Sequence, residues 1–337
     1  MRRLPIFLVI DVSESMAGAA IDNVKQGIRD LTEALTSDPY ALETAHLSVI
    51  TFAGTAKVIT PLTYILDFKV PNLSIGAGTS LSAALSVLDQ EIESKVKKNT
   101  VSCKGDWRPL VFLLTDGAPT DKYQTAVAKW KAKYGAKVEP VAVLMGENSD
   151  ASALTSLTNH VLVFKDSSAA AYKEFFRWVS TSIQTSSKEI GDTGKQSFNE
   201  KMLQNMEKDF LANTLPSENK VEYLVVPARC VKNKKLYIMR AVRYQREKKY
   251  HYDGAYPVDE RYFELSGCGE HDVTISTSDI VGDNPPCPYC GNHDFGLCSC
   301  GSCHCLHSAN DHGVKCHWCG SINDYTQMEI KIGGGRD

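Results

Sequence analysis

Long apolar runs are missing from this chain. No stretch of its 337 residues approaches the ~18 consecutive apolar residues of a membrane span. The N-terminal stretch MRRLPIFLVIDVSES contains two arginines and an apolar run of about seven residues, which is short for a signal peptide and ends in Asp11 rather than at small residues. We therefore expect a cytoplasmic protein without a membrane segment.

A strong excess of one charge is also missing. The sequence contains 37 Lys and Arg against 40 Asp and Glu, and this formal net charge of −3 favours no class of partner. Its 43% apolar and 23% charged residues are ordinary for a globular protein. At about 150 residues per domain, the length fits about two domains.

The motifs of nucleotide-binding proteins and of zinc hydrolases are absent as well. The sequence has neither the phosphate-binding pattern GxxxxGKS/T nor the pattern HExxH. Gly76-Ala-Gly78 is like part of a dinucleotide-binding loop, but it lacks the third glycine and does not follow the first predicted strand. No set of nucleophile and base is recognisable. We therefore expect that the protein is not an enzyme and has no catalytic residues and no nucleotide cofactor.

Apolar strand-like runs alternate with helical patterns over residues 1–188. The strand-like runs are IFLVI (6–10), HLSVITF (46–52), PLVFLLT (109–115), VEPVAVL (138–144) and HVLVF (160–164). Between them, apolar residues recur at helical spacing over 21–35 and 81–96. This alternation predicts an α/β domain with a doubly wound, mostly parallel, Rossmann-like sheet that helices cover on both faces.

The remainder of the chain divides into three predicted parts. Residues 189–220 are polar and rich in Ser, Lys and Glu, which predicts a linker with one helix near 198–212. Residues 221–282 contain β-branched and aromatic runs and predict a small β-rich segment. Residues 283–332 form a cysteine-rich module, and the final GGGRD predicts a frayed tail.

Small oxygen-bearing side chains follow two of the predicted strands. Asp11, Ser13 and Ser15 end the stretch IFLVIDVSESM, and Asp116 follows the strand LLT. Thr79 begins a predicted helix after the turn GAG. Doubly wound sheets bind ligands at the carboxyl ends of their strands, where these five side chains can converge. Hydroxyl and carboxylate oxygens without nitrogen or sulfur predict a hard cation such as Mg²⁺.

These separated elements resemble the metal-ion-dependent adhesion site of the von Willebrand factor A family, which combines a DxSxS stretch with a distant Thr and a distant Asp. The resemblance implies that Ser13, Ser15 and Thr79 bind the metal directly, and that Asp11 and Asp116 act mostly through water. The metal would be Mg²⁺, with Mn²⁺ or Ca²⁺ as substitutes. The resemblance also implies an open sixth position, where a protein partner donates an Asp or Glu carboxylate.

Eight of the eleven cysteines fall between residues 287 and 319. Without an export signal, such dense CxxC pairs indicate metal rather than disulfides. CPYCG and CHWCG predict an outer zinc site in a zinc ribbon-like module, with the ligands Cys287, Cys290, Cys316 and Cys319. The stretch between them predicts an inner zinc site whose ligands stay open: Cys298, Cys300, Cys303 and Cys305, with His304, His307 and His312 as substitutes. Zinc held by four thiolates has no open position for water, which indicates a structural role.

An N-terminal von Willebrand A domain followed by CPxCG…CxCGxxxC…CxWCG is similar to the TerY-type proteins of bacterial tellurite-resistance and stress operons. In that family the inner pattern uses Cys298, Cys300 and Cys305, which leaves the fourth inner ligand open. Such proteins are encoded with a serine/threonine kinase and a PP2C-type phosphatase. The resemblance implies a non-enzymatic, Mg²⁺-dependent scaffold that binds these proteins in a tellurite-resistance or stress-signalling system.

A basic, aromatic strip provides an alternative. Residues 229–252 hold nine Lys and Arg against one acid, with four tyrosines interleaved. Basic residues with aromatic neighbours bind nucleic acids by phosphate contacts and stacking. A half-exposed hairpin with a solvated basic face is the simpler interpretation, and an acidic protein partner is a third. The alternative function is therefore a nucleic-acid-associated protein that uses this strip and the zinc module.

Overall fold

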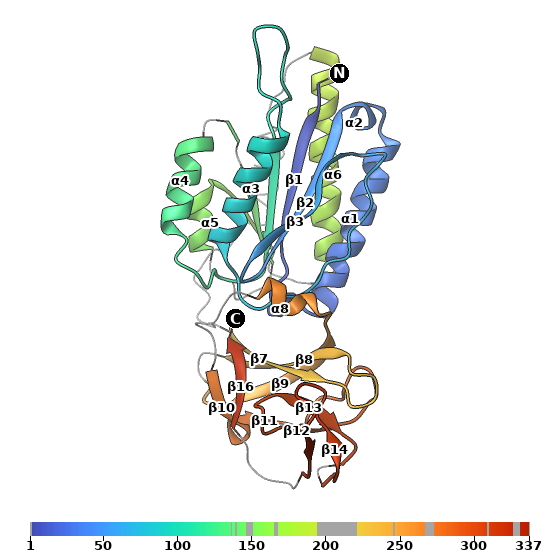
Figure 1. Cartoon of the computed structure of the whole chain (residues 1–337). Helices are drawn as coiled ribbons and strands as arrows, with labels where there is room; N and C mark the ends of the chain where they lie inside the picture. The colour runs from blue at the N-terminus through green and yellow to red at the C-terminus, as the bar shows by residue number, and fades with distance from the viewer. Residues whose placement is uncertain are drawn as a thin grey trace. The chain divides into compact units, whose positions relative to one another are not determined.

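The chain folds into two units (Figure 1), shown here as a computed structural model. The structure describes residues 2–135, 137–138, 140–145, 151–164, 168–193, 221–244, 247–266, 273–308, 310–325 and 331–336. The first unit comprises Met1–Val12, Gly18–Leu73 and Thr79–Ser217. The second comprises Glu218–Asp337 together with two short segments from earlier in the chain, Ser13–Ala17 and Ser74–Gly78.

A six-stranded sheet forms the centre of the first unit. Its strands are β1 (Leu4–Asp11), β2 (Ala45–Phe52), β3 (Ala56–Tyr64), β4 (Leu110–Thr115), β5 (Pro140–Met145) and β6 (His160–Phe164). They lie in the order β3-β2-β1-β4-β5-β6, and all neighbours are parallel except β3, which is antiparallel to β2. β1, β4 and β5 are buried along their whole length, which explains their nearly continuous apolar sequences.

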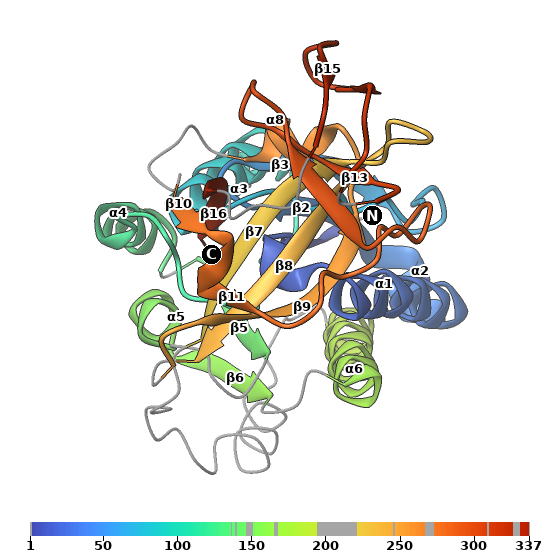
Figure 2. The same ribbon diagram turned by 90° about the horizontal axis from the view of Figure 1, so that it is seen from below.

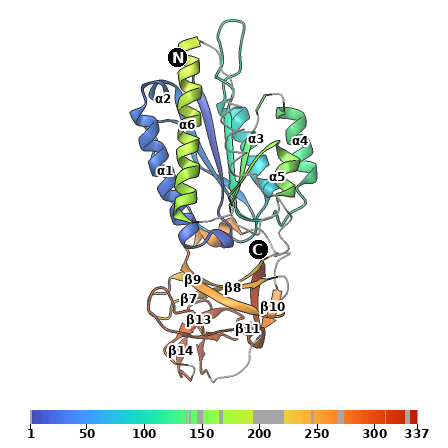
Figure 3. The ribbon, with the colours of Figure 1, turned by 180° about the vertical axis from the view of Figure 1, so that it is seen from behind.

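Helices cover both faces of this sheet (Figure 3). On one face lie α1 (Ala19–Ser37), α2 (Pro39–Thr44) and α6 (Ala169–Thr193), and on the other lie α3 (Leu81–Lys95), α4 (Gln124–Tyr134) and α5 (Ser152–Leu157). Gly27 allows α1 to approach α6 closely, because a methyl group there would overlap the ring of Phe176. Among the described residues, no helix combines the length and the apolar character needed to cross a membrane.

Three antiparallel strands form the main sheet of the second unit (Figure 2): β7 (Val221–Arg229), β8 (Leu236–Tyr244) and β9 (Tyr250–Pro257). The short helix α8 (Arg261–Leu265) follows β9. β16 (Lys331–Arg336) pairs with β7 and with β10 (Val273–Ser276), while β11 (Ile280–Val281) pairs with β9. The strands that extend this sheet on either side of β7, β8 and β9 therefore come from parts of the chain that lie far apart in the sequence.

The cysteine-rich part joins the same sheet. β13 (Cys303–Leu306) pairs with β12 (Asp294–Leu297) and, in parallel, with the end of β7. β14 (Val314–Lys315) and β15 (Ile322–Asn323) form a separate pair. One hydrophobic core contains residues from both halves of the unit, including Val226, Met239, Cys287 and Cys305. The segments 221–282 and 283–332, which the sequence suggested as two parts, therefore share one sheet and one core.

The predicted fold class is confirmed, because a mostly parallel α/β sheet precedes a β-rich, cysteine-containing region. α6 continues past residue 188, the expected end of the first domain, to Thr193. The helix predicted near 198–212 lies outside the described residues. The prediction of a frayed tail is wrong up to Arg336, because the backbone of Gly335 and Arg336 pairs with β7.

Candidate metal centres

Asp11 and Asp116 lie at the same edge of the central sheet. β1 and β4 pair in parallel with Ile10 beside Leu114, so both strands end at this edge. Asp11 is the last residue of β1 and is fully buried, whereas Asp116 directly follows β4 and is half-buried. Thr115 Oγ1 donates a 2.5 Å hydrogen bond to Asp11 Oδ2. The two carboxylates therefore lie where sheets of this kind bind their ligands.

Tyr172 is the phenol that faces this acidic edge. Its burial, together with the carboxylates of Asp116 and Asp11, raises the pKa of Tyr172 far above the usual value of a tyrosine. Both acids therefore act on one side chain within the first unit. Two carboxylates at the same edge repel each other when both are ionised, and a bound cation would relieve that repulsion.

Thr79 is tied to the loop that follows Asp116. The backbone N–H of Thr79 donates to Thr120 Oγ1 at 3.0 Å, and the Thr79 carbonyl accepts from the Thr120 amide at 2.8 Å. Thr79 is only 2% exposed. The structure therefore brings Thr79 to the loop of Asp116.

Asp121 fixes the start of the helix that follows Thr79. Its carboxylate accepts hydrogen bonds from Ser80 Oγ at 2.8 Å and from the Ser82 amide at 2.9 Å, at the N-terminus of α3. Free amides at a helix N-terminus favour such an anionic acceptor. Sequence reasoning gave Asp121 no role, although it lies in the same stretch, LLTDGAPTD, as Asp116.

Ser13 and Ser15 follow Asp11 in the same peptide. Glu14–Met16 forms one turn of 3₁₀ helix, and Ser13 Oγ lies 3.0 Å from Ser15 Oγ. Ser13 is fully buried and Ser15 is half-buried. The two hydroxyls therefore meet within this turn, as alternate residues of a DxSxS stretch should. That all five residues bind one ion stays a prediction.

Several cysteines of the second unit begin tight turns. In three of them the amide of the cysteine donates to the carbonyl five residues later, and its carbonyl accepts from the amide four residues later: Cys230, Cys287 and Cys316. The turn at Cys298 is one residue shorter. Gly291 and Gly320, which follow the CxxC pairs, have φ values of +76° and +82°, so a residue without a Cβ suits these positions.

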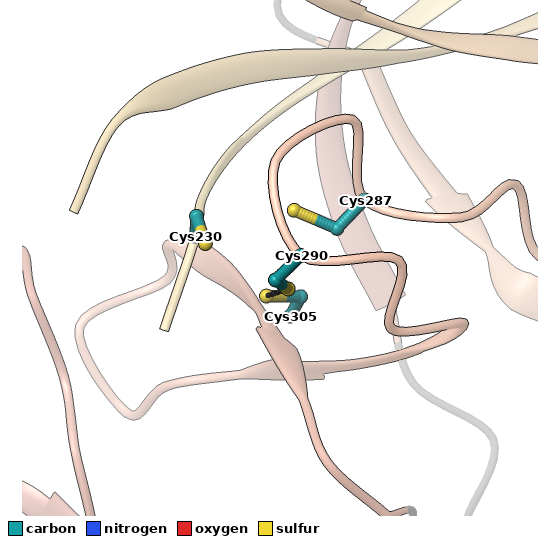
Figure 4. Close-up of side chains that lie close together, drawn as sticks. All are labelled: Cys230, Cys287, Cys290 and Cys305. Carbon is teal, nitrogen blue, oxygen red and sulfur yellow. Dashed lines mark hydrogen bonds between the residues drawn. The ribbon is translucent and has the colours of Figure 1, made fainter. Parts of the chain in front are cut away.

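The first group of thiols contains Cys230, Cys287, Cys290 and Cys305, whose sulfur atoms all lie within 4.8 Å of one another. Figure 4 shows them converging from three segments of the chain. Parallel pairing of β13 with the end of β7 places Cys305 near Cys230. The Val231 amide also donates to Cys305 Sγ at 3.2 Å. This group lies in the core of the second unit, since Cys290 alone of the four is partly exposed.

The second group contains Cys298, Cys300, Cys316 and Cys319, again with all sulfur atoms within 4.8 Å of one another. Cys298 and Cys316 are buried, whereas Cys300 and Cys319 are exposed. The Trp318 amide donates to Cys316 Sγ at 3.4 Å. The second group is therefore a surface site, in contrast to the first.

This grouping corrects the division into an outer and an inner site. The two CxxC pairs do not meet, because each pair combines with two cysteines from elsewhere. Among the described residues, Cys303 belongs to neither group and is buried in the core. His304 is fully buried and its Nε2 lies 2.5 Å from the Tyr325 hydroxyl. His307 and His312 also lie outside both groups, beside Asn292 and Asp324.

The surroundings shift the pKa values of these thiols in opposite directions. Burial raises the pKa of Cys287 to about 11 and that of Cys303 to about 12. Burial also opposes ionisation of Cys298, but hydrogen bonds from the Cys300 backbone and the Ser321 hydroxyl lower its pKa to about 5. Donors that favour the thiolate of Cys298 also favour its use as a metal ligand.

Two protein families match this chain, one over the first unit and one over the cysteine-rich unit. Residues 6–178, 173 of the 337, match the von Willebrand factor type A domain. The chain belongs to this family. Residues 220–336 match the TerY-C metal binding domain. A von Willebrand A domain followed by this module confirms the predicted TerY-type organisation and identifies the cysteine-rich region as metal-binding.

The chain is also similar to several solved structures. A von Willebrand factor type A protein from Catenulispora acidiphila is 17% identical with a TM-score of 0.44, covering 54% of this chain and 43% of that one. Proximal thread matrix protein 1 from the mussel byssus is 19% identical with a TM-score of 0.40, covering 54% and 48%. Another structure of that mussel protein has zinc in its MIDAS motif. The chain thus spans less than half the length of these proteins, and no curated protein matches it.

Sequence reasoning missed Cys230 as a candidate ligand of the TerY-C region. It is a single cysteine in the turn between two strands, 57 positions before Cys287, and no CxxC pair marks it. Its turn includes Lys234 with a φ of +65°, the same left-handed backbone that glycine supplies after the CxxC pairs. The only sequence signal is a cysteine in a turn of the pattern CxxN, which is weak.

The basic strip 229–252 is divided by the fold. Three of its arginines form ion pairs: Arg229 with Glu260, Arg240 with Asp253 and Arg243 with Glu222. Its described lysines lie in two turns, 232–235 before β8 and 248–249 after it. Because these turns are at opposite ends of β8, they do not form one basic surface.

Proposed function

We propose that this protein is a non-enzymatic scaffold whose von Willebrand A domain binds a protein partner through Mg²⁺. The ligands would be Ser13, Ser15 and Thr79, with Asp11 and Asp116 acting through water, and Mn²⁺ or Ca²⁺ could substitute. One observation carries the proposal: Asp11 and Asp116 end neighbouring parallel strands, and Thr79 is bonded to the loop after Asp116. Oxygen ligands at such an edge suit a hard cation.

The partner would supply an acidic side chain. Three hydroxyl oxygens and water leave Mg²⁺ a position for one more oxygen, and Mg²⁺ prefers six oxygen ligands in octahedral geometry. An Asp or Glu carboxylate meets that need and adds a charge that the metal neutralises. A metal–carboxylate contact in a shielded site is screened less by salt than an exposed ion pair.

We also propose zinc as the metal of both cysteine groups. The distance between sulfur atoms is 3.6 Å for Cys290 and Cys305, 3.6 Å for Cys298 and Cys319, and 3.9 Å for Cys300 and Cys316. A tetrahedron with Zn–S bonds of about 2.3 Å has edges of roughly 3.8 Å. A disulfide would need a distance of about 2.05 Å. Four thiolates fill the coordination of zinc, so the role would be structural.

The cellular setting of the proposal comes from the resemblance to TerY-type proteins. On that ground the partners to try first are a serine/threonine kinase and a PP2C-type phosphatase encoded beside it. The system would be one of tellurite resistance or stress signalling in the cytoplasm. The C-terminal region would then act as a second docking element held in shape by zinc.

The test measures complex formation between the full chain and each of these two partners. Wild type and the double variant Ser13→Ala, Ser15→Ala are compared with and without Mg²⁺, in metal-depleted buffer rather than EDTA because EDTA also competes for zinc. We expect binding only by wild type with Mg²⁺, and loss of binding when one acidic residue of the partner is replaced by Ala. Equal affinity in all conditions would place the partner on another surface.

Nucleic-acid binding through 229–252 is the alternative that the same preparation tests. Binding by phosphate contacts falls steeply with salt. The arginine ion pairs and the two separated lysine turns make this alternative less favourable than the metal-dependent one. DNA or RNA binding with a steep salt dependence, unaffected by the serine variants, would favour it.

A further inference from the structure

Arg240 is a buried cation in the middle of β8. It is 8% exposed, and its Nε donates to Asp253 Oδ2 at 2.6 Å. Its guanidinium also lies 4.5 Å from the ring centre of Tyr256 and 5.4 Å from that of Tyr223. These contacts neutralise the charge and fix the plane of the guanidinium. One nitrogen, Nη1, remains directed at a different part of the second unit.

Nη1 of Arg240 binds the turn that contains the two serines of the DxSxS stretch. It donates to the carbonyls of Glu14 at 2.9 Å, Ser15 at 2.7 Å and Ala17 at 3.3 Å. These residues belong to Ser13–Ala17, the segment that is part of the second unit and that we call the adhesion-site turn. One side chain thereby sets the orientation of three carbonyls of this turn, those of Glu14, Ser15 and Ala17.

A second side chain holds the same turn. The Tyr262 hydroxyl, from α8, donates to the carboxylate of Glu14, which is fully buried. Glu14 lies between the two serines in sequence, and its side chain points to α8 while their hydroxyls meet each other at 3.0 Å. The middle position of DxSxS therefore ties the adhesion-site turn to α8 within the second unit.

The Gly-rich loop before Thr79 is held in a similar way. Ser74 Oγ donates to Asp259 Oδ2 at 2.7 Å, and Ser266 Oγ accepts from the Ala77 amide at 2.9 Å. Asp259 and Ser266 flank α8 on either side. Both segments that lead to predicted hydroxyl ligands are thus bonded to β8, α8 and the residues beside them.

We infer that Arg240 is a positioning residue for Ser13 and Ser15 of the adhesion-site turn, so that this arginine sets the affinity with which their hydroxyls bind Mg²⁺. The inference builds on the proposed Mg²⁺ site. Hydroxyl ligands bind weakly unless they are already in place, and residues that orient metal ligands commonly change affinity by about 10–100-fold when they are replaced. Carbonyls fixed by a buried guanidinium keep the serine side chains in one arrangement.

The first cysteine group extends this chain of contacts. Cys230 forms the turn between β7 and β8, with its amide donating to the Lys235 carbonyl and its carbonyl accepting from the Lys234 amide, both at 2.9 Å. Arg240 lies on β8 beside Val225 of β7. A metal bound at Cys230 would therefore stabilise the hairpin that carries Arg240 and, through Arg240, the adhesion-site turn.

The experiment measures Mg²⁺ affinity by calorimetry on the full, zinc-loaded chain. Arg240→Gln should weaken Mg²⁺ binding about tenfold. Arg243→Gln is the matched control, because Arg243 is also a paired arginine of β8 but forms its ion pair with Glu222. Arg240→Lys should recover part of the affinity, because it restores a donor without the planar fork. Tyr262→Phe should weaken binding in the same direction with less disturbance of the fold.

Two further measurements distinguish a positioning role of Arg240 from a general destabilisation of the fold. Zinc content should be the same for Arg240→Lys, Tyr262→Phe and wild type, while amides of the adhesion-site turn exchange hydrogen faster in Arg240→Gln. An Arg240→Gln chain with full zinc and wild-type Mg²⁺ affinity would overturn the inference, as would equal weakening by Arg243→Gln. If Ser13→Ala abolishes Mg²⁺ binding in that case, the proposed function stands. A wild-type chain that binds no Mg²⁺ would overturn both.

Discussion

Cys230 gives the sharpest test of the metal centres, because the fold identifies it and the sequence pattern does not. We predict that Cys230→Ser removes one metal ion per chain and destabilises the second unit. Structural zinc contributes about 10–16 kcal/mol of apparent binding energy at neutral pH, so loss of the ion should cost at least the equal share of one thiolate among four, about 3 kcal/mol. Cys230 is also fully buried, and a hydroxyl in its place adds a cost of desolvation.

That loss is large enough to measure by unfolding. A change of about 3 kcal/mol should lower the melting temperature of a unit of this size by roughly 10 °C. The assay combines elemental analysis of zinc after gel filtration with calorimetric unfolding of the full chain. Cys103→Ser is the matched control, since Cys103 is an exposed thiol outside both groups and should leave zinc content and stability unchanged.

A second comparison separates the observed grouping from the one the sequence suggested. Cys303→Ala should keep all zinc, because Cys303 packs in the core and lies in neither group. Retention of zinc by Cys230→Ser together with loss by Cys303→Ala would refute the grouping. Full zinc and unchanged stability in both variants would refute the thiolate site around Cys230 altogether.

Three further predictions concern the first unit. Thr79→Ala should abolish Mg²⁺ binding in calorimetry while circular dichroism stays unchanged, because Thr79 lies at the edge of the sheet; unchanged affinity would contradict its role as a ligand. Asp121→Ala should destabilise the first unit by about 1–2 kcal/mol in urea unfolding, because it removes acceptors from the start of α3; no change would show that water replaces the carboxylate. Burial opposes ionisation of Asp106, but hydrogen bonds from Arg3 and the Lys97 amide outweigh it and hold the pKa of Asp106 below its usual range. Its stabilising effect is therefore complete above the unfolded value of about 3.9 and disappears as the pH falls through the lowered pKa, and acid unfolding of Asp106→Asn should lack this part of the pH dependence.

Much of the first unit could be predicted because its signals are local. Strands buried on both faces have nearly continuous apolar sequences, as β1 and β4 do, and amphipathic helices lie between them. The order of strand and helix then determines which strand ends meet at the ligand-binding edge. Asp11 and Asp116 could be placed together on this ground alone.

The partners of the cysteines could not be predicted in the same way. CxxC spacing identifies a pair of ligands in one turn, but it carries no information about which other turn approaches it. Here β13 pairs with β7, and this long-range contact brings Cys305 to Cys230, while Cys287 and Cys316 belong to different groups. The number of intervening residues, which suggested two nested sites, does not encode this pairing.

The burial of the two thiol groups implies different roles in folding. The first group lies in a core with Val226, Met239 and Tyr250, and its ligands come from β13, the β7–β8 turn and the CPYCG turn. A metal bound there would add to the stability of the second unit, whose small core otherwise depends on apolar side chains alone. The second group has two exposed cysteines and joins two neighbouring turns, so its metal fixes a surface loop rather than the sheet. Loss of the first metal therefore disturbs β8 and the arginine it carries, whereas loss of the second leaves that strand paired with β7 and β9.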